Sequence, residues 1–532
     1  MKTSYSAVIA TLIVPLFFLS TNDLSAQRVV KVPQGVGTLN QTINGDTTAT
    51  GARKDLTTIY ELDKDGYYIT MGTIENRNYH LRIRAAAGTG KRPIIRPGVV
   101  SGGASSRPFG PYGDLTLDGV YVTNLDEQNG LKEYTVRISA DNVKLTILNS
   151  HFDRDRQIAI RCDGKNASII IKNSIISNVG TMSDPSNGRG VDDRGTDIDT
   201  LIYENNTFFN FTSRIIRDGG GVIKYCRINH NTVVNVGQMG CTMGSVIKGS
   251  FTNNLFVNTG FLGNDTSSTA TVNYTVGTGP LSQAWLTLGY VQKLEIHNNN
   301  FYVSPEIIAA FPPVRKKTQP IFDAYADSII ALRGWSSSNA KLSVSFTSSP
   351  QAPLQVMKSF YDTTVTPKPE MDRGTGSPDF GMTQMPFNFA YPTSSTLYTA
   401  GTRTGSNPPQ PIGDLNYFGM QPDGDGTIIT GVEDDGIVSP SEYQLYSNYP
   451  NPFNPSTTIR YTLPVAGGVQ LEIVNTLGQT INALVNQHQQ AGTHSVVWDG
   501  TDMNGDQAST GVYIYRLKTA NSVLAKKMIL LK

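Results

Sequence analysis

The sequence predicts an all-β protein: a right-handed parallel β-helix, then an irregular linker region, then a small Ig-like β-sandwich. Composition is the first reason, because only 16% of the 532 residues are charged and 51 are glycine, a balance typical of short strands joined by tight turns. The second is a repeated unit in the first half of the chain. The third is period-two alternation between G-G, N-G and D-G turns near the C-terminus. This length exceeds one ordinary domain, so at least two folded units are expected.

The N-terminus predicts a secretory signal peptide over residues 1–26. Lys2 supplies a positive start, residues 7–19 are apolar, and the small residues around Ser25 precede a cleavage site. The apolar run is too short to span a membrane comfortably, and no later run is long enough. No transmembrane segment is therefore expected in the mature chain.

Charge and cysteine content narrow the classes further. A formal net charge of +1 lacks the basic excess of a nucleic-acid binder, so no nucleic-acid partner is expected. The three cysteines are too few for a disulfide framework. Buried thiols are expected, with one possible bridge, at Cys162, Cys226 and Cys241.

Short apolar-alternating runs recur within residues 27–305, the predicted β-helix. Anchoring each run on a polar corner residue gives intervals of 31, 24, 33, 25, 23 and 45 residues, so the unit is 23 to 25 residues and the longer intervals carry insertions. A unit of this size with three short strands fits one coil, and stacked coils enclose a continuous core. Asparagine tolerates left-handed backbone and its amide can bond neighbouring coils, whereas a β-sandwich, the alternative, does not explain a fixed corner. The corner residues are Asp118, Asn149, Asn173, Asn206, Asn231, Asn254 and Asn299.

Counting back from the corners predicts a column of arginines on four successive coils. Three stand twelve residues before a corner asparagine, and the fourth stands fourteen before, in a coil whose Gly-Gly-Gly run could hold a bulge. Alternation turns neighbours such as Val136 and Ile160 inward and the arginines outward. Stacked like charges ~5 Å apart repel by roughly 1 kcal/mol in water, so carboxylates or an anionic ligand must offset them. The predicted substrate-binding residues are Arg137, Arg161, Arg194 and Arg217.

Two interpretations of this column stay open. Insertions at residues 177–193 and 264–285 precede the arginine-bearing strand and are expected to wall a groove over it. The guanidinium forks would then bind carboxylate or sulfate groups of an acidic polysaccharide. In the other interpretation the arginines form a structural network with nearby carboxylates, drawn from Asp153, Asp155, Asp163, Asp192, Asp193 and Asp218.

No complete catalytic or metal motif is present in the sequence. A polysaccharide lyase needs a base and a cation that stabilises the resulting anion. No lysine stands in a motif typical of such a catalytic base, and the six histidines do not have the spacing of metal ligands. The catalytic residues stay unassigned, and enzyme and non-enzyme both remain open. A pair of carboxylates for glycoside hydrolysis would be equally unspecific. No cofactor is certain, and Ca²⁺ has only weak candidate ligands, at Asp192, Asp193, Asp197 and Asp199.

The opening of the mature chain carries a resemblance at the level of the fold. VVKVPQGVGTLNQTI at residues 29–43, followed by YELDKDGYYI and LRIRAAAGTGKRPIIRPG, resembles the first coils of pectate-lyase-like and chondroitinase-B-like β-helices. The resemblance covers roughly residues 29–305 and does not fix an activity. It implies a β-helix that engages polysaccharide, with acidic-polysaccharide lyase activity as the enzymatic variant. A non-catalytic adhesin, carbohydrate-binding or structural protein is the alternative.

Residues 306–438 are rich in Pro, Ser and Thr and predict a capping and linker region. Within it, AYADSIIALRG at residues 324–334 predicts a short helix that covers the end of the β-helix, which would otherwise expose a sheet edge.

Residues 439–532 carry the most specific motifs. YPNPFNPSTTIRY at residues 449–461, WDG at 498–500 and GVY at 511–513 resemble the type A sorting domain of the type IX secretion system. An Ig-like carbohydrate-binding module is the alternative. The resemblance implies that the type IX secretion machinery is a partner and that the protein is secreted or held on the outer surface of a didermic bacterium. The sorting motif begins with Tyr449, Pro450, Asn451, Pro452, Phe453, Asn454 and Pro455.

Overall fold

The computed structural model describes residues 27–99, 107–263, 274–311, 320–362, 364–373, 386–401, 409–420, 422, 443–445, 448, 453–463, 467–476, 478–489, 492–503, 505–520 and 522–531. The predicted signal peptide, residues 1–26, lies outside the described residues. Within those ranges no helix has the length and the apolarity needed to cross a membrane.

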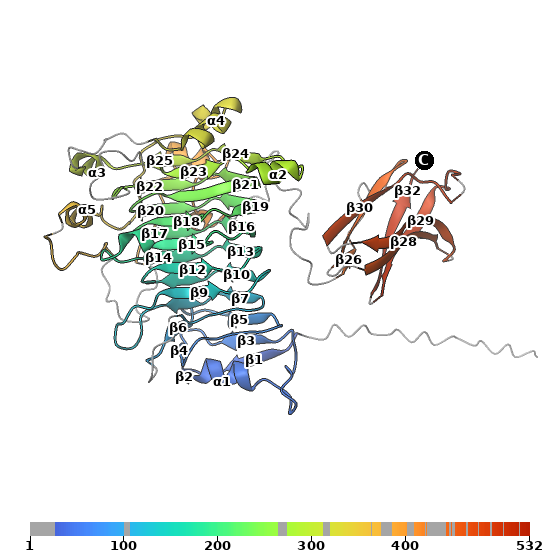
Figure 1. Ribbon diagram of the computed structural model, residues 1–532, viewed down its shortest axis with the longest axis horizontal. Helices are drawn as coiled ribbons and strands as arrows, with labels where there is room; N and C mark the ends of the chain where they lie inside the picture. Colours follow the sequence, from blue (N-terminus) through green and yellow to red (C-terminus); the bar gives the residue numbers. More distant parts are fainter. Residues whose placement is uncertain are drawn as a thin grey trace, which may run out of the picture.

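Parallel strands stack into a β-helix with three faces (Figure 1). The first face consists of β1 (Val29–Val32), β3 (Ile59–Leu62), β5 (Leu81–Ala85), β7 (Leu115–Asp118), β10 (Lys144–Leu148), β13 (Ala167–Lys172), β16 (Ile198–Glu204), β19 (Val222–Asn229), the second half of β21 (Cys241–Thr252) and β24 (Lys293–His297). The second face consists of β2 (Gly35–Val36), β4 (Tyr67–Thr70), β6 (Ile94–Pro97), β8 (Tyr121–Thr123), β11 (His151–Asp153), β14 (Ile175–Val179), β17 (Thr207–Phe211), β20 (Thr232–Val236), β22 (Leu255–Thr259) and β25 (Asn300–Tyr302). The third face consists of β9 (Tyr134–Ile138), β12 (Ile158–Cys162), β15 (Arg189–Asp192), β18 (Arg214–Arg217), the first half of β21 and β23 (Val276–Gly279).

The interior of the coils is one continuous apolar core, as the period-two pattern predicts. Val136, Ile138 and Ile160 point inward and are fully buried, with the arginines between them on the outside. All three cysteines are buried and free. The disulfide bridge that the sequence left possible is therefore not formed.

The corner between the first and second faces uses two consecutive positions, which corrects the single anchor used in the sequence. The first position has left-handed backbone, with φ of 50° at both Asn149 and Asn173. The second position is buried and carries the amide ladder, in which Asn231 Nδ2 donates to Asn254 Oδ1 at 2.9 Å. Strand register places Asn205, His230, Asn253 and Asn298 at the first position and Asn206, Asn231, Asn254 and Asn299 at the second.

Helices close both ends of the β-helix (Figure 1). At the N-terminal end, α1 (Thr38–Gly45) inserts Leu39 and Ile43 into the core. At the other end, α4 (Ala324–Leu332) does the same with Ala326 and Ile330, and its N-terminus is capped by Asp323, whose Oδ1 accepts from the N–H of Ala326 at 2.8 Å. The helix that the sequence predicts at residues 324–334 is thus present and covers the end of the core.

Part of the region predicted as capping and linker covers the outside of the second face. Apolar side chains on β17, β20 and β22 pack against apolar residues within 387–412. Polar contacts fix this cover: Leu415 N donates to Asn205 Oδ1, and Thr207 Oγ1 donates to Asp414 Oδ2, both at 2.6 Å. The sequence did not predict the cover because its apolar residues are scattered among Pro, Ser and Thr without a regular period. The packed apolar residues are Phe209, Val234, Leu255, Val257, Phe387, Phe389, Tyr391, Leu397 and Ile412.

The remaining helices are short and lie around the coils. These are α2 (Gln283–Thr287), α3 (Pro305–Ala310), α5 (Leu354–Tyr361) and the 3₁₀ helices η1 (Pro185–Asn187), η2 (Ser336–Ser338), η3 (Thr396–Thr399) and η4 (Leu415–Phe418). Helices α3 and α5 share an apolar cluster with Phe261 and Leu262, which follow β22.

The C-terminal block folds as an antiparallel Ig-like unit with its own core, as predicted. In its described residues, one sheet has three strands and the other has four. The first contains β26 (Gln444–Leu445), β27 (Thr457–Leu463) and β30 (Gly492–Trp498); the second contains β28 (Gly467–Asn475), β29 (Thr480–Gln489), β31 (Gly511–Thr519) and β32 (Val523–Leu530).

Candidate functional site

Strand register on the third face decides which of the predicted arginines are equivalent. Arg161 lies beside Arg137 on one side and beside Asp192 on the other, and Asp192 lies beside Arg217. The predicted column is therefore corrected at its third member. Arg194 lies two residues beyond Asp192, in a left-handed turn with φ of 56°. The count failed because its corner residue was one position late and because this turn is one residue longer than in the preceding coils.

Two further arginines, Arg189 and Arg214, are register partners on the same face. They were not among the arginines predicted from the sequence. In β18 both Ile215 and Ile216 enter the core, so residues 214 and 217 both lie outside although strict alternation would put them on opposite sides. A signal was present. The spacing of three between charged residues in β15 recurs 25 residues later in β18.

Two aspartates pair with all four predicted arginines. Asp163 accepts from Nε of Arg137 at 2.7 Å and from Nε of Arg161 at 3.0 Å. Asp192 accepts from Arg189 at 2.5 Å and from Arg217 at 3.0 Å, and Arg194 Nη1 lies 3.6 Å from its Oδ2. These ion pairs are what the structural interpretation requires.

Burial and charge act in opposite directions on Asp192, whose side chain is 0% exposed. Burial alone would raise the pKa of Asp192, but the guanidinium groups of Arg189 and Arg217 outweigh it and hold the pKa below its ordinary value. Asp192 is therefore a charged, buried centre around which arginines of two coils gather.

Arg214 differs from its neighbours in having only neutral partners among the described residues. Its guanidinium group donates to Ser213 Oγ at 3.3 Å, Gln238 Oε1 at 3.3 Å and Thr242 Oγ1 at 3.4 Å. Burial, with the adjacent positive charges of Arg189 and Arg217, lowers the pKa of Arg214 to about 10. A half-buried cation held by three long hydrogen bonds to neutral acceptors is compensated less directly than Arg189 and Arg217, which both pair with Asp192.

A pair of carboxyl groups lies at the turn beside this cluster. Asp193 Oδ1 accepts from the N–H groups of Gly195 at 2.9 Å and Gly219 at 2.6 Å. Burial, together with the hydrogen bond and charge of Asp218, raises the pKa of Asp193 to about 8, so the Asp193 carboxyl group is protonated near neutral pH. Four guanidinium groups against three carboxyl groups, one of them protonated, leave a charge of about +2 on the cluster. We call it the arginine cluster: Arg189, Asp192, Asp193, Arg194, Arg214, Arg217 and Asp218.

The four aspartates considered for calcium are engaged by separate partners. Asp192 holds arginines and Asp193 holds backbone N–H groups, while Asp197 Oδ1 accepts from Val222 N at 2.9 Å and Asp199 Oδ1 lies 3.2 Å from Lys224 Nζ. Within the described part of the chain, no three His, Cys, Asp or Glu side chains are grouped to hold a metal ion. The weak calcium prediction is therefore not supported by the arrangement of these residues.

The remaining aspartates of the predicted network face other partners. Asp153 pairs with Arg154 at 3.2 Å. Asp155 is buried and accepts from Asn124 at 2.5 Å and Thr135 at 2.9 Å. Neither reaches the arginine cluster through a described contact.

The two predicted insertions differ in how they border the third face. The first enters directly before β15, and its Ser186 carbonyl accepts from Arg189 Nε at 3.1 Å. The second was expected to be a loop over residues 264–285. Its residues 276–279 instead form β23 on the third face, α2 follows at the next corner, and residues 264–273 lie outside the described residues.

Tyr134 of β9 is a candidate catalytic base on the third face. Its hydroxyl accepts from Arg161 Nη1 at 3.0 Å, and the guanidinium carbon lies 5.3 Å from the centre of the ring. Tyr134 is only 5% exposed, so access to it is restricted.

The described motifs of the C-terminal unit converge on Trp498. Phe453 lies with its ring centre 5.5 Å from that of Trp498, and Tyr513 lies 5.3 Å from it on another side. Phe453 also joins the last strand, since its N–H donates to Ile529 O at 3.0 Å. Asn454 and Pro455 are exposed. Tyr449, Pro450, Asn451 and Pro452 lie outside the described residues.

Comparison with known proteins gives a family match within the C-terminal unit. Residues 455–522 match the family model of the FlgD Ig-like domain. No curated protein matches the chain.

Among solved structures, the chain is similar over short stretches to three proteins. The first is dimeric latent PorU from Porphyromonas gingivalis, at 24% identity, 17% of this chain, 9% of that chain and a TM-score of 0.15. The second is PorZ of the same organism, described as an essential bacterial surface component of the type-IX secretion system, at 19% identity, 16% and 11% coverage and a TM-score of 0.13. The third is FlgD from P. aeruginosa, at 21% identity, 17% and 67% coverage and a TM-score of 0.13. The chain thus spans about a tenth of PorU and PorZ.

Proposed function

We propose that this chain is an exported protein whose β-helix binds acidic polysaccharide at the arginine cluster. The observation that carries the proposal is Arg214. A half-buried cation beside two other cations is unfavourable unless an anion compensates it. A carboxylate or sulfate group of a ligand would accept two parallel hydrogen bonds from the guanidinium fork and remove both penalties.

The geometry of the third face favours a polymer over a single small anion. Adjacent coils of a parallel β-helix repeat at about 4.8 Å, and arginines stand on the successive strands β9, β12, β15 and β18. A chain with regularly spaced anionic groups can therefore meet several coils. The resemblance of residues 29–305 to pectate-lyase-like and chondroitinase-B-like β-helices agrees with this ligand class.

Binding and its site can be tested together by titrating the full secreted chain with alginate, pectate and chondroitin sulfate, with dextran as the neutral polymer. Arg214→Gln is expected to weaken binding of the preferred acidic polymer at least about tenfold, the effect of losing one charge-assisted pair. Arg333→Gln, an exposed arginine after α4, is the matched control and should leave binding unchanged. Equal binding of wild type and Arg214→Gln would reject this site.

Lyase activity is the second candidate, and Tyr134 with Arg161 is the observation that favours it. Elimination would need Tyr134 to remove the proton α to a uronate carboxylate while an arginine compensates the anion; the glycosidic C4–O bond then breaks as the C4–C5 double bond forms, and the leaving oxygen takes up a proton. The measurement is ultraviolet absorbance from unsaturated uronate with the same polymers, comparing wild type with Tyr134→Phe. No absorbance on any of them would leave the non-catalytic binding function in place.

A structural fibre built by stacking β-helices end to end is disfavoured. Such stacking needs open sheet edges at both ends, whereas α1 and α4 insert apolar side chains into the core at the two ends. A surface adhesin that binds glycan through the third face remains compatible with both caps.

The C-terminal unit is proposed to act as the sorting domain for the type IX secretion machinery and to place the protein outside the cell or on its outer surface. The motifs at residues 449–461, 498–500 and 511–513 support this role. Fusing residues 439–532 behind a signal peptide and a reporter should export the reporter in a bacterium with a type IX system. Retention of the reporter in the periplasm would contradict it.

A further inference from the structure

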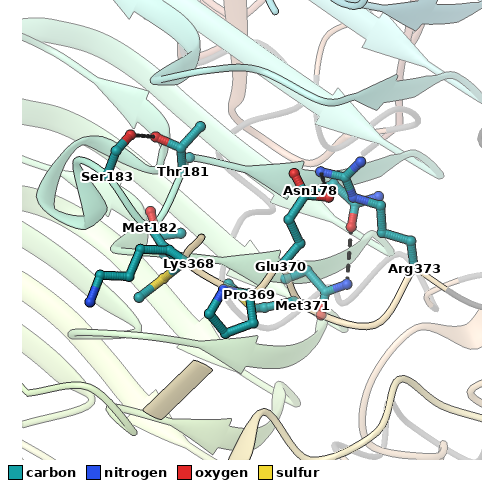
Figure 2. Close-up of a pocket in the computed structure, with 12 residues that line it drawn as sticks. Asn178, Thr181, Met182, Ser183, Lys368, Pro369, Glu370, Met371 and Arg373 are labelled. Carbon is teal, nitrogen blue, oxygen red and sulfur yellow. Dashed lines mark hydrogen bonds and ion pairs between the residues drawn. The ribbon is translucent and has the colours of Figure 1, made fainter. Parts of the chain in front are cut away.

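A pocket of about 270 Å³ lies where the insertion after β14 meets residues 368–373 (Figure 2). Its walls come from Asn178 on β14, Asn210 on β17, residues 180–183 of the insertion and the 368–373 segment. Ligand sites for drug-sized molecules usually measure about 300–1,000 Å³. The pocket therefore suits one ring-sized unit and not an extended chain. We call it the side pocket.

The back wall of the side pocket is fixed by a chain of amide hydrogen bonds. Asn210 Nδ2 donates to Asn178 Oδ1 at 3.0 Å and to the carbonyl of Asp372 at 2.7 Å. Asn178 Nδ2 in turn donates to Asp153 Oδ1 at 2.7 Å. These bonds join the β-helix to the 368–373 segment, so the wall is held in place before any ligand arrives and little ordering remains for binding to cost.

One part of the pocket is apolar and the rim is polar. Met182 and Met371 line the pocket and also pack against the apolar cluster of α3 and α5. The rim carries the hydroxyl groups of Thr181 and Ser183, whose oxygen atoms lie 2.9 Å apart, as Figure 2 shows. A sugar ring presents C–H groups on its faces and hydroxyl groups around its edge, which matches both surfaces.

Charges in the side pocket leave a positive excess. Arg373 Nη2 pairs with Glu370 Oε2 at 2.9 Å, and the two side chains lie together beside Asn178 in Figure 2. Lys368 Nζ donates to the backbone carbonyls of Ser359 at 2.5 Å and Asp362 at 3.1 Å, which are neutral acceptors. Two cations against one carboxylate give a net charge of about +1, which favours an anionic ligand.

From these observations we infer that the side pocket binds one acidic sugar unit, a uronate. The ligand class rests on the proposed function, because the same acidic glycan would supply the unit. The side pocket and the arginine cluster are adjacent but share no residue: the pocket is lined by Thr181–Ser183 and Thr212, whereas the cluster begins at Arg189 and Arg214. A branch or chain end of the polymer is held in the side pocket while its backbone lies on the third face.

The test uses the full chain labelled with ¹³C at the methyl groups of its 12 methionines. The Met182 and Met371 signals are assigned by Met→Leu variants. Glucuronate and galacturonate are the acidic probes, and glucose and galactose are the neutral controls. Both acidic probes, or one of them, should shift these two methyl signals in a saturable way, and the neutral sugars should shift them at least about tenfold less at equal concentration. The inference would be overturned if neither uronate shifted these two signals, or if the neutral sugars shifted them as much as the uronates did.

Substitutions at half-buried Arg373 and exposed Glu370 are expected to change uronate binding in opposite directions. Arg373→Gln should weaken uronate binding roughly tenfold because it removes a charge-assisted partner. Glu370→Gln should strengthen it a few-fold because it releases Arg373 from its ion pair and removes a repelling carboxylate. Effects of the same sign in both variants would contradict the electrostatic basis of the site.

Failure here is distinguishable from failure of the proposed function. Arg214→Gln should weaken polymer binding at least about tenfold yet leave the Met182 and Met371 shifts with uronate unchanged. Uronate binding without any polymer binding would retain the side pocket and reject the arginine cluster. Polymer binding that depends on Arg214, with no methyl shift from either uronate, would retain the arginine cluster and reject the side pocket.

Discussion

Arg217 Nη1 donates to Asp192 Oδ1 at 3.0 Å, and the two residues are register partners on adjacent coils. Asp192 lies where the sequence predicted the third of four stacked arginines, Arg194. An aspartate in the column converts a stack of like charges into an alternating one, since Arg161, Asp192 and Arg217 follow each other across β12, β15 and β18. The repulsion expected from four stacked arginines is thereby relieved within the protein at most positions.

Replacing the buried carboxylate should cost far more than replacing the exposed one. Asp192→Asn leaves Arg189 and Arg217 without their buried anion and should destabilise the β-helix by about 3–5 kcal/mol. Asp163→Asn should cost about 1 kcal/mol at most, because that side chain is 24% exposed and solvent screens it. Calorimetric unfolding of the full chain measures both, and a smaller loss for Asp192→Asn than for Asp163→Asn would contradict the buried-centre description.

Arg214 should behave as a functional residue in a stability measurement. Arg214→Gln removes a positive charge beside Arg189 and Arg217 and breaks only long hydrogen bonds to neutral acceptors. We therefore expect the free energy of unfolding to stay constant or to rise by on the order of 1 kcal/mol. Arg217→Gln, which loses an ion pair, is the comparison and should destabilise. A loss of several kcal/mol for Arg214→Gln would show that Arg214 is a structural residue.

Stability should fall as pH rises through the titration of Asp193. Its folded-state pKa is raised by burial and by Asp218, so the folded protein binds the proton more tightly than the unfolded chain. The stabilisation is full below the ordinary aspartate pKa of about 4 and is lost as pH rises toward the raised value.

Asp193→Asn mimics the protonated carboxyl group and keeps an acceptor for Gly195 and Gly219. Its stability relative to wild type should be greater at pH 8 than at pH 5, by on the order of 2 kcal/mol. Thermal unfolding at the two pH values measures this. The buried Asp414, whose pKa is raised by burial to about 7, titrates in both proteins and cancels from the comparison. An unchanged difference between the two pH values would show that the pKa of Asp193 is not raised in the folded protein.

The two corner positions should respond differently to substitution. Asn231 is 0% exposed and bonds Tyr203 O and Asn254 Oδ1, both at 2.9 Å, so Asn231→Ala should cost about 2–4 kcal/mol. Asn149 is exposed with φ of 50°, so Asn149→Gly should be nearly neutral while Asn149→Val should cost about 1–2 kcal/mol. Unfolding by denaturant separates the three variants. Equal losses for Asn231→Ala and Asn149→Gly would contradict the two-position corner.

The C-terminal unit should depend on Trp498, which is 1% exposed and contacts Phe453 and Tyr513. Trp498→Ala should destabilise this unit by about 3–5 kcal/mol and leave the unfolding of the β-helix unchanged, because the two have separate cores. If the unit is the sorting domain, export of the variant should fall in parallel with its folding. Normal export of a variant with an unfolded C-terminal unit would reject a role for its folded surface.

Much of the fold was predictable because its determinants are local and repeated. Period-two alternation put Val136, Ile160 and their neighbours in the core, and recurring asparagines marked the corners. The helix at residues 324–334 and the antiparallel C-terminal unit also followed from short-range patterns. What failed was register. The repeats were aligned on a single polar corner residue, although the corner has two distinct positions. In β18 the consecutive residues Ile215 and Ile216 both point into the core, so strict alternation did not predict that Arg214 lies on the outside.

The sequence by itself determined that coils stack, that arginines gather on one face and that an Ig-like unit follows, because strand alternation, repeat length and turn residues act over a few residues. Only the tertiary structure decided which charges meet. Asp192 replaced Arg194 in the column through a one-residue shift at a corner and a one-residue longer turn, and the side pocket joins residues nearly 200 positions apart, such as Asn178 and Arg373. Which residues meet on neighbouring coils depends on the lengths of all the turns between them, and a pattern over a few residues does not contain that information.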